Sequence, residues 1–214
     1  MILDGGGIQF LSSMYVYMGS ASGVSTVPAA SLPGVPPTYA SNDIAIADGS
    51  DFDDDGYADL AAGASNTIIV YRGGPSGIAS SPRIERTVAA ISPYSYNFKI
   101  SGGGDLDGDG HDDLVVTYDD VYVFPGGANG IAMTPSITFT PPNDSATIYG
   151  YQLGGFADVD GDGFADLPVG APFDNNWIGR SYLFRGSATG LDTTPATTFT
   201  GTSPSGAQFG SAVR

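Results

Sequence analysis

The sequence predicts an all-β protein made of repeated four-stranded units, and three observations support this interpretation. The acidic pattern D-x-D-x-D-G-x-x-D-L occurs at residues 51–60, 105–114 and 158–167. From Asp51 to Asp105 is 54 residues and from Asp105 to Asp158 is 53, so the pattern has a nearly fixed period. Gly (32) and Pro (15) are frequent, and no stretch keeps a helical periodicity of apolar residues. These features are typical of a turn-rich β protein.

Each period holds four segments with the character of strands. The first precedes the acidic loop, the second leaves it, the third enters a glycine turn, and the fourth is rich in threonine. First strands are expected at residues 44–46, 98–100 and 151–153, with a fourth copy at 209–213. Fourth, outer strands are expected at residues 84–88, 136–139 and 197–200. Four short strands in a period of this length predict the blades of a β-propeller.

The glycine turn supports the same period with a second motif. It recurs at residues 16–24, 70–78, 123–131 and 183–191, and its first glycines are 54, 53 and 60 residues apart. We therefore expect a single domain, residues 1–214, of about four blades in units 1–41, 42–95, 96–148 and 149–208, with 209–214 starting or completing a further blade.

Three arrangements of these blades stay open. The chain could form a ring closed by N- and C-terminal strands that share one blade, with residues 209–213 beside Ile2 and Leu3. It could be half of an eight-bladed dimer. It could also be a piece of a longer propeller.

The acidic loops predict calcium sites. In residues 105–114, aspartates occupy loop positions 1, 3, 5 and 9, and Gly110 at position 6 permits a sharp turn. Oxygen ligands at this spacing suit Ca²⁺, and His111 at position 7 would offer its backbone carbonyl. An EF-hand is excluded because position 12 is Val116 rather than Glu and the loop runs into a strand. The alternative is an acidic solvated turn, in which the crowded carboxylates would repel one another.

The combined motifs resemble the FG-GAP repeats of the integrin α-subunit propeller. Phe209-Gly210 and Tyr149-Gly150 stand at the FG position, Gly170-Ala171-Pro172 stands at GAP, residues 63–65 are a weakened copy, and residues 117–119 depart from it. The resemblance covers essentially the whole chain, although the integrin family uses seven blades. It implies three Ca²⁺ per chain, in the loops between the first and second strands of a blade. The implied ligands are Asp51, Asp53, Asp55 and Asp59 with the carbonyl of Tyr57; Asp105, Asp107, Asp109 and Asp113 with that of His111; and Asp158, Asp160, Asp162 and Asp166 with that of Phe164.

Composition excludes several classes of function. The net charge is −16 with only seven Lys and Arg, so nucleic acid and anionic membrane are poor partners. No apolar window is long enough for a membrane span.

The single histidine lies in an acidic loop, which disfavours a histidine-based triad. A glycosidase would need Asp119, Asp120 or Asp174, and nothing in the sequence brings such a pair together. We therefore expect no enzymatic activity.

The leading hypothesis is a non-enzymatic, calcium-stabilised binding, adhesion or scaffold module outside the cell. A carbohydrate-binding lectin and an accessory propeller of a larger secreted enzyme are the alternatives. The expected partner is a protein or a glycan, or a second copy completing a larger propeller. The absence of cysteine and the scarcity of lysine favour a secreted or surface protein of bacterial origin.

A candidate ligand site lies in the longest loop between a second and a third strand. It contains Trp177, the only tryptophan, together with Asn176 and Asp174. In propellers of this type the loop faces away from the calcium loops. An exposed Trp can stack on a sugar ring or anchor a protein contact. The alternative is a rim aromatic that packs against an adjacent blade.

Overall fold

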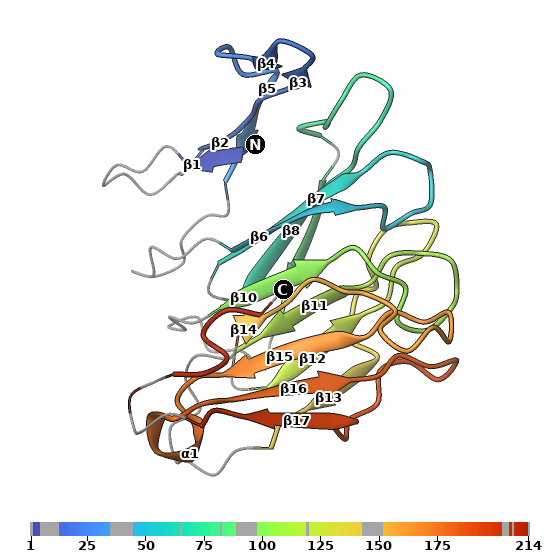
Figure 1. The fold of residues 1–214 in the computed structure, drawn as a ribbon. Coiled ribbons are helices and arrows are strands. Elements are labelled where there is room, and N and C mark those ends of the chain that lie inside the picture. Colours follow the sequence, from blue (N-terminus) through green and yellow to red (C-terminus); the bar gives the residue numbers. More distant parts are fainter. Residues whose placement is uncertain are drawn as a thin grey trace.

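In the computed structural model, the protein is almost entirely β-structure. The structure describes residues 2–4, 13–34, 45–64, 66–81, 83–88, 98–118, 120–142, 152–202, 206 and 208–213. Within these residues, antiparallel sheets lie one above another in chain order (Figure 1). The predicted all-β fold of repeated four-stranded units is therefore confirmed.

Three of the sheets have four strands, and each follows the predicted order from first to fourth strand. The first described unit has three strands and a small ribbon. Its strands are β1 (Ile2–Asp4), β2 (Ser13–Val16) and β5 (Ala30–Pro33), and the ribbon is β3 (Gly19–Ser20) with β4 (Gly23–Val24). The second unit consists of β6 (Ala45–Ser50), β7 (Asp59–Ala64), β8 (Thr67–Tyr71) and β9 (Arg83–Thr87), and the third of β10 (Lys99–Gly102), β11 (Leu114–Thr117), β12 (Val121–Phe124) and β13 (Ile137–Phe139). The fourth unit consists of β14 (Gln152–Leu153), β15 (Leu167–Ala171), β16 (Arg180–Phe184) and β17 (Thr197–Thr200).

The boundaries differ from the predicted ones by one or a few residues. Strands β6 and β10 run up to four residues farther toward the acidic loops than predicted, because they continue pairing with β7 and β11. Strand β9 is displaced by one residue from its predicted range, and β13 is one residue shorter than predicted, whereas β17 matches its prediction. Ile44 and Tyr151, and the predicted unit boundaries at 41/42, 95/96 and 148/149, lie outside the described residues.

Successive sheets are held together by three apolar clusters, one for each interface. Alternate side chains of a strand face opposite neighbours, which is the period of a pleated strand. On β12, Val121 and Val123 pack toward the β14–β17 sheet, whereas Tyr122 and Phe124 pack toward the β6–β9 sheet. Both faces of the inner strands are thus buried, which explains why strands such as β8 and β11 have continuous apolar sequences.

The sheets fan out as the blades of a propeller do. The first strand β10 contacts both β6 and β14, the first strands of the neighbouring units. No comparable contact joins the outer strands β9, β13 and β17 within the described residues. Figure 1 shows the same arrangement, with β6, β10 and β14 following one another along one side of the stack.

The FG and GAP motifs meet across successive units. A Cβ on Gly63, the glycine of the weakened GAP copy, would collide with the ring of Phe98, which precedes β10 of the next unit. A Cβ on Gly170 would likewise collide with the carbonyl of Gly210. Glycine is thus needed in the second strand because the start of the following unit packs directly on its backbone.

The C-terminal segment packs on its own neighbour and is not in a strand. Phe209 makes a single bridge with Gly179, and residues 210–213 have no strand conformation. In the described residues β1 pairs with β2 alone, so the arrangement with residues 209–213 beside Ile2 and Leu3 does not occur. The strand predicted over residues 209–213 is therefore not formed, because in the described residues this segment makes only the parallel bridge between Phe209 and Gly179. That residues 209–214 start a further blade stays a prediction.

The outward face of the last sheet has no following sheet over it in the described structure. Position 2 of the acidic loop shows the difference clearly. Phe52 and Leu106 are fully buried under the next unit, whereas Val159 at the same position of the last loop is 62% exposed.

Candidate metal sites in the three acidic loops

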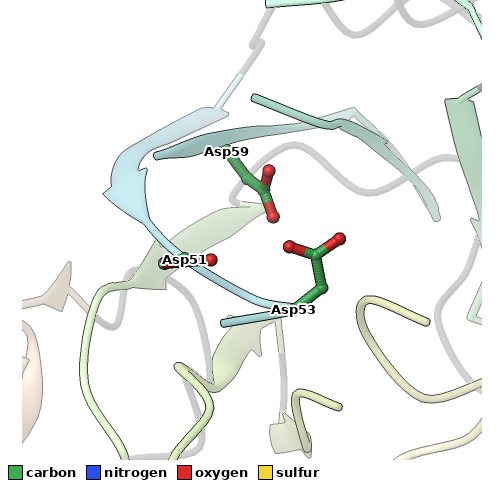
Figure 2. A group of neighbouring side chains, drawn as sticks. All are labelled: Asp51, Asp53 and Asp59. Carbon is green, nitrogen blue, oxygen red and sulfur yellow. The ribbon is translucent and has the colours of Figure 1, made fainter. Parts of the chain in front are cut away.

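Each acidic loop connects the first and second strands of its unit and brings three carboxylates together. The groups are Asp51, Asp53 and Asp59; Asp105, Asp107 and Asp113; and Asp158, Asp160 and Asp166, and in each the ligand oxygens lie within 4.8 Å of one another. Figure 2 shows the first group, in which the carboxylates of Asp53 and Asp59 point toward each other with Asp51 beside them. Positions 1, 3 and 9 of the predicted ligand sets are therefore adjacent in all three loops.

The carboxylate at position 1 shapes the loop. In the central loop, Asp105 accepts hydrogen bonds from the backbone N–H groups of Gly108 (2.6 Å), Asp109 (3.1 Å) and Gly110 (2.8 Å). Asp158 makes the corresponding three bonds, and Asp51 makes the last two of them. Gly110 has φ +91°, a conformation that favours glycine. The sequence thus specifies the tight turn locally.

The aspartate at position 5 has a different role from the one predicted from spacing. Oδ1 of Asp109 accepts the backbone N–H of His111 at 2.9 Å, and Asp55 and Asp162 make the same contact with Tyr57 and Phe164. These aspartates are exposed and are not members of the three groups. Their predicted part in metal binding, and that of the carbonyls at position 7, stays a prediction.

The aspartate at position 9 is buried and connects two distant parts of its unit. Oδ2 of Asp113 accepts the N–H of Leu106 at 2.9 Å, and Oδ1 accepts the N–H of Gly126 at 2.9 Å. The equivalent bonds of Asp59 go to Phe52 and Gly73, and those of Asp166 go to Val159 and Gly186. Each acidic loop is thereby fastened to the glycine turn that follows the third strand.

The first glycine of that turn is a functional residue that sequence reasoning had treated only as a turn. A Cβ on Gly126 would collide with the carbonyl of Asp112, and Gly73 and Gly186 meet the carbonyls of Ala58 and Ala165. The repeated spacing between the acidic loop and the glycine turn was the available signal.

The next unit also holds the loop from outside. Asp112 and Gly127 donate backbone N–H bonds to the carbonyls of Asp51 (3.2 Å) and Phe52 (2.9 Å). Ala165 and Ser187 repeat the pattern one unit later, toward Asp105 and Leu106. In the first two loops, the carboxylate positions are therefore set by three elements, namely the loop, the glycine turn of the same unit and the following unit.

Burial and mutual repulsion make Asp59, Asp107 and Asp113 reluctant to ionise. Burial raises the pKa of Asp113 to about 7, although the N–H groups of Gly126 and Leu106 lower it, and the charges of Asp107 and Asp109 raise it further. Burial likewise raises the pKa of Asp59 to about 6, with the amide of Gly73 opposing it and the charge of Asp53 adding to it. Burial and the charge of Asp109 raise the pKa of Asp107. A cation among the carboxylates would remove this repulsion.

The residues present fit a hard divalent cation. The donors are carboxylate oxygens, which suit Ca²⁺. Oδ1 of Asp53 is buried and accepts no hydrogen bond, and the Asp53 side chain is only 4% exposed. A buried carboxylate oxygen without a partner is costly, so a cation at this point would satisfy it.

The candidate ligand site at Trp177 lies at the other end of its sheet from the acidic loop. Residues Asp174–Trp177 (α1) join β15 to β16, and Asn175, Asn176 and Trp177 have positive φ values of 50°, 55° and 67°. Asparagine tolerates this left-handed conformation, whereas tryptophan rarely adopts it. Trp177 is 48% exposed and makes an edge contact with Phe173, whose ring centroid is 4.8 Å away.

Asp174 is buried, in contrast to its neighbours in this segment. Its Oδ2 accepts bonds from the Tyr182 hydroxyl (2.7 Å) and from Nη1 of Arg180 (3.1 Å), and Oδ1 accepts the N–H of Asn175 (2.8 Å). Asp174 therefore supports the segment from inside, and Asn176 and Trp177 are exposed. Asp120, one of the aspartates considered for a glycosidase pair, accepts a hydrogen bond from the hydroxyl of Thr140. Asp119 lies outside the described residues.

Comparison with known proteins agrees with this architecture. Residues 105–169, which run from the central acidic loop through the last one into β15, match the family model described as FG-GAP-like repeat. The chain is 34% identical to human integrin alpha-10 over 77 residues, covering 36% of this chain and 6% of that protein. It is 31% identical to human integrin alpha-6 over 124 residues (53% and 10%). It is 26% identical to integrin alpha-5 of Xenopus laevis over 163 residues (68% and 15%).

The chain spans about a tenth of the length of these curated relatives, from 6% to 15%. Among solved structures, it is similar to one titled as the crystal structure of TcdB2-TccC3 without its hypervariable C-terminal region. That similarity has a TM-score of 0.44 and 19% identity, and it covers 82% of this chain and 9% of the other. Among the described residues, no helix has the length and hydropathy of a membrane span. The repeated motifs, the stacked four-stranded sheets and the family match over residues 105–169 together make this chain similar to the FG-GAP repeats of the integrin alpha subunits.

Proposed function

We propose that this chain is a non-enzymatic, extracellular binding or scaffold module whose blades are stabilised by calcium. The observation that carries the proposal is the convergence of three carboxylates in each of three equivalent loops. Each loop leads into a second strand that is mostly buried, and the first two loops are also bonded to the following unit, so a cation held there would act on the packing of neighbouring sheets. Calcium would supply positive charge at the point where the carboxylates repel.

The proposed calcium ligands are the aspartates at positions 1, 3 and 9 of each loop, completed by position 5 and the carbonyl at position 7. Calcium takes six to eight oxygen ligands at about 2.3–2.6 Å. The aspartate at position 9 has a double role in this scheme, because its oxygens also accept backbone amides from the glycine turn. We propose one ion per loop and three per chain.

Metal analysis and calorimetry test this proposal. After dialysis against a chelator, the protein is titrated with Ca²⁺ and with Mg²⁺, and the bound metal is measured. We expect three Ca²⁺ per chain and weaker binding of Mg²⁺, which requires near-ideal octahedral geometry and gives up water reluctantly. Failure to bind calcium at millimolar concentration would show that the loops are acidic turns without a metal function.

An extracellular location is proposed from the same loops. Extracellular calcium modules bind with dissociation constants of about 10⁻⁴–10⁻³ M, far above cytosolic calcium concentrations. We therefore expect affinities in that range. Affinity near 10⁻⁸ M, which is typical of cytosolic buffers, would remove this support.

The proposed partner surface is the end of the last described sheet that carries Trp177 and Asn176. An exposed aromatic side chain beside an amide, on a backbone segment held rigidly by Asp174, is suited to anchor a protein contact. The same pair could stack on a sugar, so binding is measured against a glycan array and a panel of extracellular matrix proteins. Trp177→Ala should abolish the interaction without changing the melting temperature. A glycan hit with no protein hit would favour the lectin function.

A further inference from the structure

The three acidic loops differ at the residue that precedes the first glycine of the following turn. That residue is Arg72 in the unit of the first loop, Pro125 in the unit of the central loop and Arg185 in the unit of the last. The backbone fastens this position beside the loop in every unit, through the bond from the glycine N–H to the aspartate at position 9. An arginine at this position can therefore reach the carboxylate group, whereas a proline has no charged group to place there.

Both arginines pair with the carboxylate at position 3. Nη1 of Arg72 lies 2.8 Å from Oδ2 of Asp53, and Nε of Arg185 lies 3.1 Å from Oδ2 of Asp160. The two pairs differ in exposure. In the first pair the side chains of Arg72 and Asp53 are 35% and 4% exposed. In the second pair those of Arg185 and Asp160 are 50% and 25% exposed. Water screens the second pair more strongly.

In the central loop, Asp107 receives a backbone N–H from Asp109 at 3.2 Å, and the side chain of Pro125 carries no charge. The only imidazole in the chain, His111, has its Nδ1 3.8 Å from Oδ1 of Asp109 at position 5, beyond hydrogen-bond distance.

We propose, on the basis of the calcium function above, that the three sites are ranked by these residues. The central loop binds the cation most tightly and depends on it most. Arg72 and Arg185 occupy a ligand oxygen and place a positive charge beside the first and last sites, so they weaken cation binding there and partly replace the ion in its absence. The effect of Arg72 is larger because its carboxylate partner is more deeply buried.

Coulomb's law sets the size of the expected difference. A unit positive charge a few ångströms from a divalent ion, even with the screening of bulk water, weakens binding about tenfold, which corresponds to about 1.4 kcal/mol. The central site should therefore have a dissociation constant smaller by a factor of about ten or more than that of the first site.

Exchanging the residue at this position tests the ranking. Calcium is titrated into the metal-free protein in competition with a chromophoric chelator. Wild type should give one tight step and two weaker ones. Pro125→Arg should remove the tight step, whereas Pro125→Ala, which deletes the ring without adding charge, should keep it. Arg72→Met should create a second tight step, and Arg72→Lys, which retains the charge, should not.

The possible results separate this inference from the function on which it depends. Three binding steps of equal affinity, or a tight step that survives Pro125→Arg, would overturn the ranking and leave the calcium function intact. Absence of calcium binding in wild type would overturn both. Terbium luminescence excited through tyrosine gives a second, site-specific readout, because only the first loop has a tyrosine, Tyr57, at position 7. Arg72→Met should lower the terbium concentration at half-saturation of this signal about tenfold, and an unchanged value would contradict the role of Arg72.

Discussion

Asp113 and Gly126 are 13 residues apart in the sequence, yet Oδ1 of Asp113 accepts the backbone N–H of Gly126 at 2.9 Å. The other oxygen accepts the N–H of Leu106, so one buried carboxylate joins the acidic loop to the glycine turn. The same relationship recurs in the other two loops. The aspartate at position 9 is therefore a structural residue before any metal is considered.

Asp113→Asn should destabilise the protein even in a chelator. An amide cannot accept both backbone N–H groups, and leaving a buried donor unsatisfied costs about 1–3 kcal/mol. Asp109→Asn, at exposed position 5 of the same loop, is the matched control and should have a smaller effect in the chelator. Thermal unfolding followed by circular dichroism compares the two. Equal melting temperatures for the two variants without metal would contradict the structural role of Asp113.

Stability without metal should depend on pH in a direction set by the raised pKa values. The pKa of Asp113 is raised to about 7 and that of Asp59 to about 6, above the usual value of 3.8. Groups whose pKa is raised by folding contribute stability that is present below the unfolded pKa and is lost as pH rises through the folded pKa. In EDTA, the melting temperature should therefore fall as the pH rises from about 4 to about 7.

Calcium should reverse that dependence, because its ligands must be ionised. In the presence of calcium, acidification should protonate the ligands, weaken calcium binding and lower the melting temperature, at a pH that falls as the calcium concentration rises. A metal-free protein that is more stable at pH 8 than at pH 5 would contradict the raised pKa values. Far-UV circular dichroism at each pH checks that the fold is retained.

Removing calcium should lower the melting temperature substantially. Binding to the folded state alone adds about 2.7 kcal/mol per independent site at a hundredfold excess of ligand over its dissociation constant. Three sites would thus contribute an amount comparable to the net stability of a domain, about 5–15 kcal/mol. Calorimetry with and without EDTA measures the change, and Asp109→Ala should reproduce part of it. An unchanged transition in protein shown to be metal-free would mean that apolar packing alone holds the blades.

Gly170→Ala should destabilise the last sheet, because the new methyl group would collide with the backbone carbonyl of Gly210. Overpacking of this kind typically costs about 1–3 kcal/mol. Gly155→Ala is the control, since a Cβ at Gly155 meets nothing within 4 Å. Urea unfolding measures both variants. Equal stability would mean that the contact between the GAP glycine and the following FG motif is unimportant.

The sequence by itself determined what is local or periodic in this protein. The strands alternate or run apolar over a few residues, the D-x-D-x-D-G turn is closed by bonds within five residues of Asp105, and the period repeats these elements. These features depend on neighbours along the chain, so the all-β fold, the order of strands and the position of the acidic loops could be predicted.

The tertiary structure decided which of those residues meet. Position 9 is buried in all three loops, where its carboxylate accepts the backbone N–H of the glycine turn, whereas the exposed position 5 is not a member of the carboxylate groups. The contact of Arg72 with Asp53, the packing of Gly170 on Gly210 and the separation of residues 209–213 from β1 all join segments distant in sequence. No local pattern encodes such contacts, because they arise only when whole sheets stack face to face.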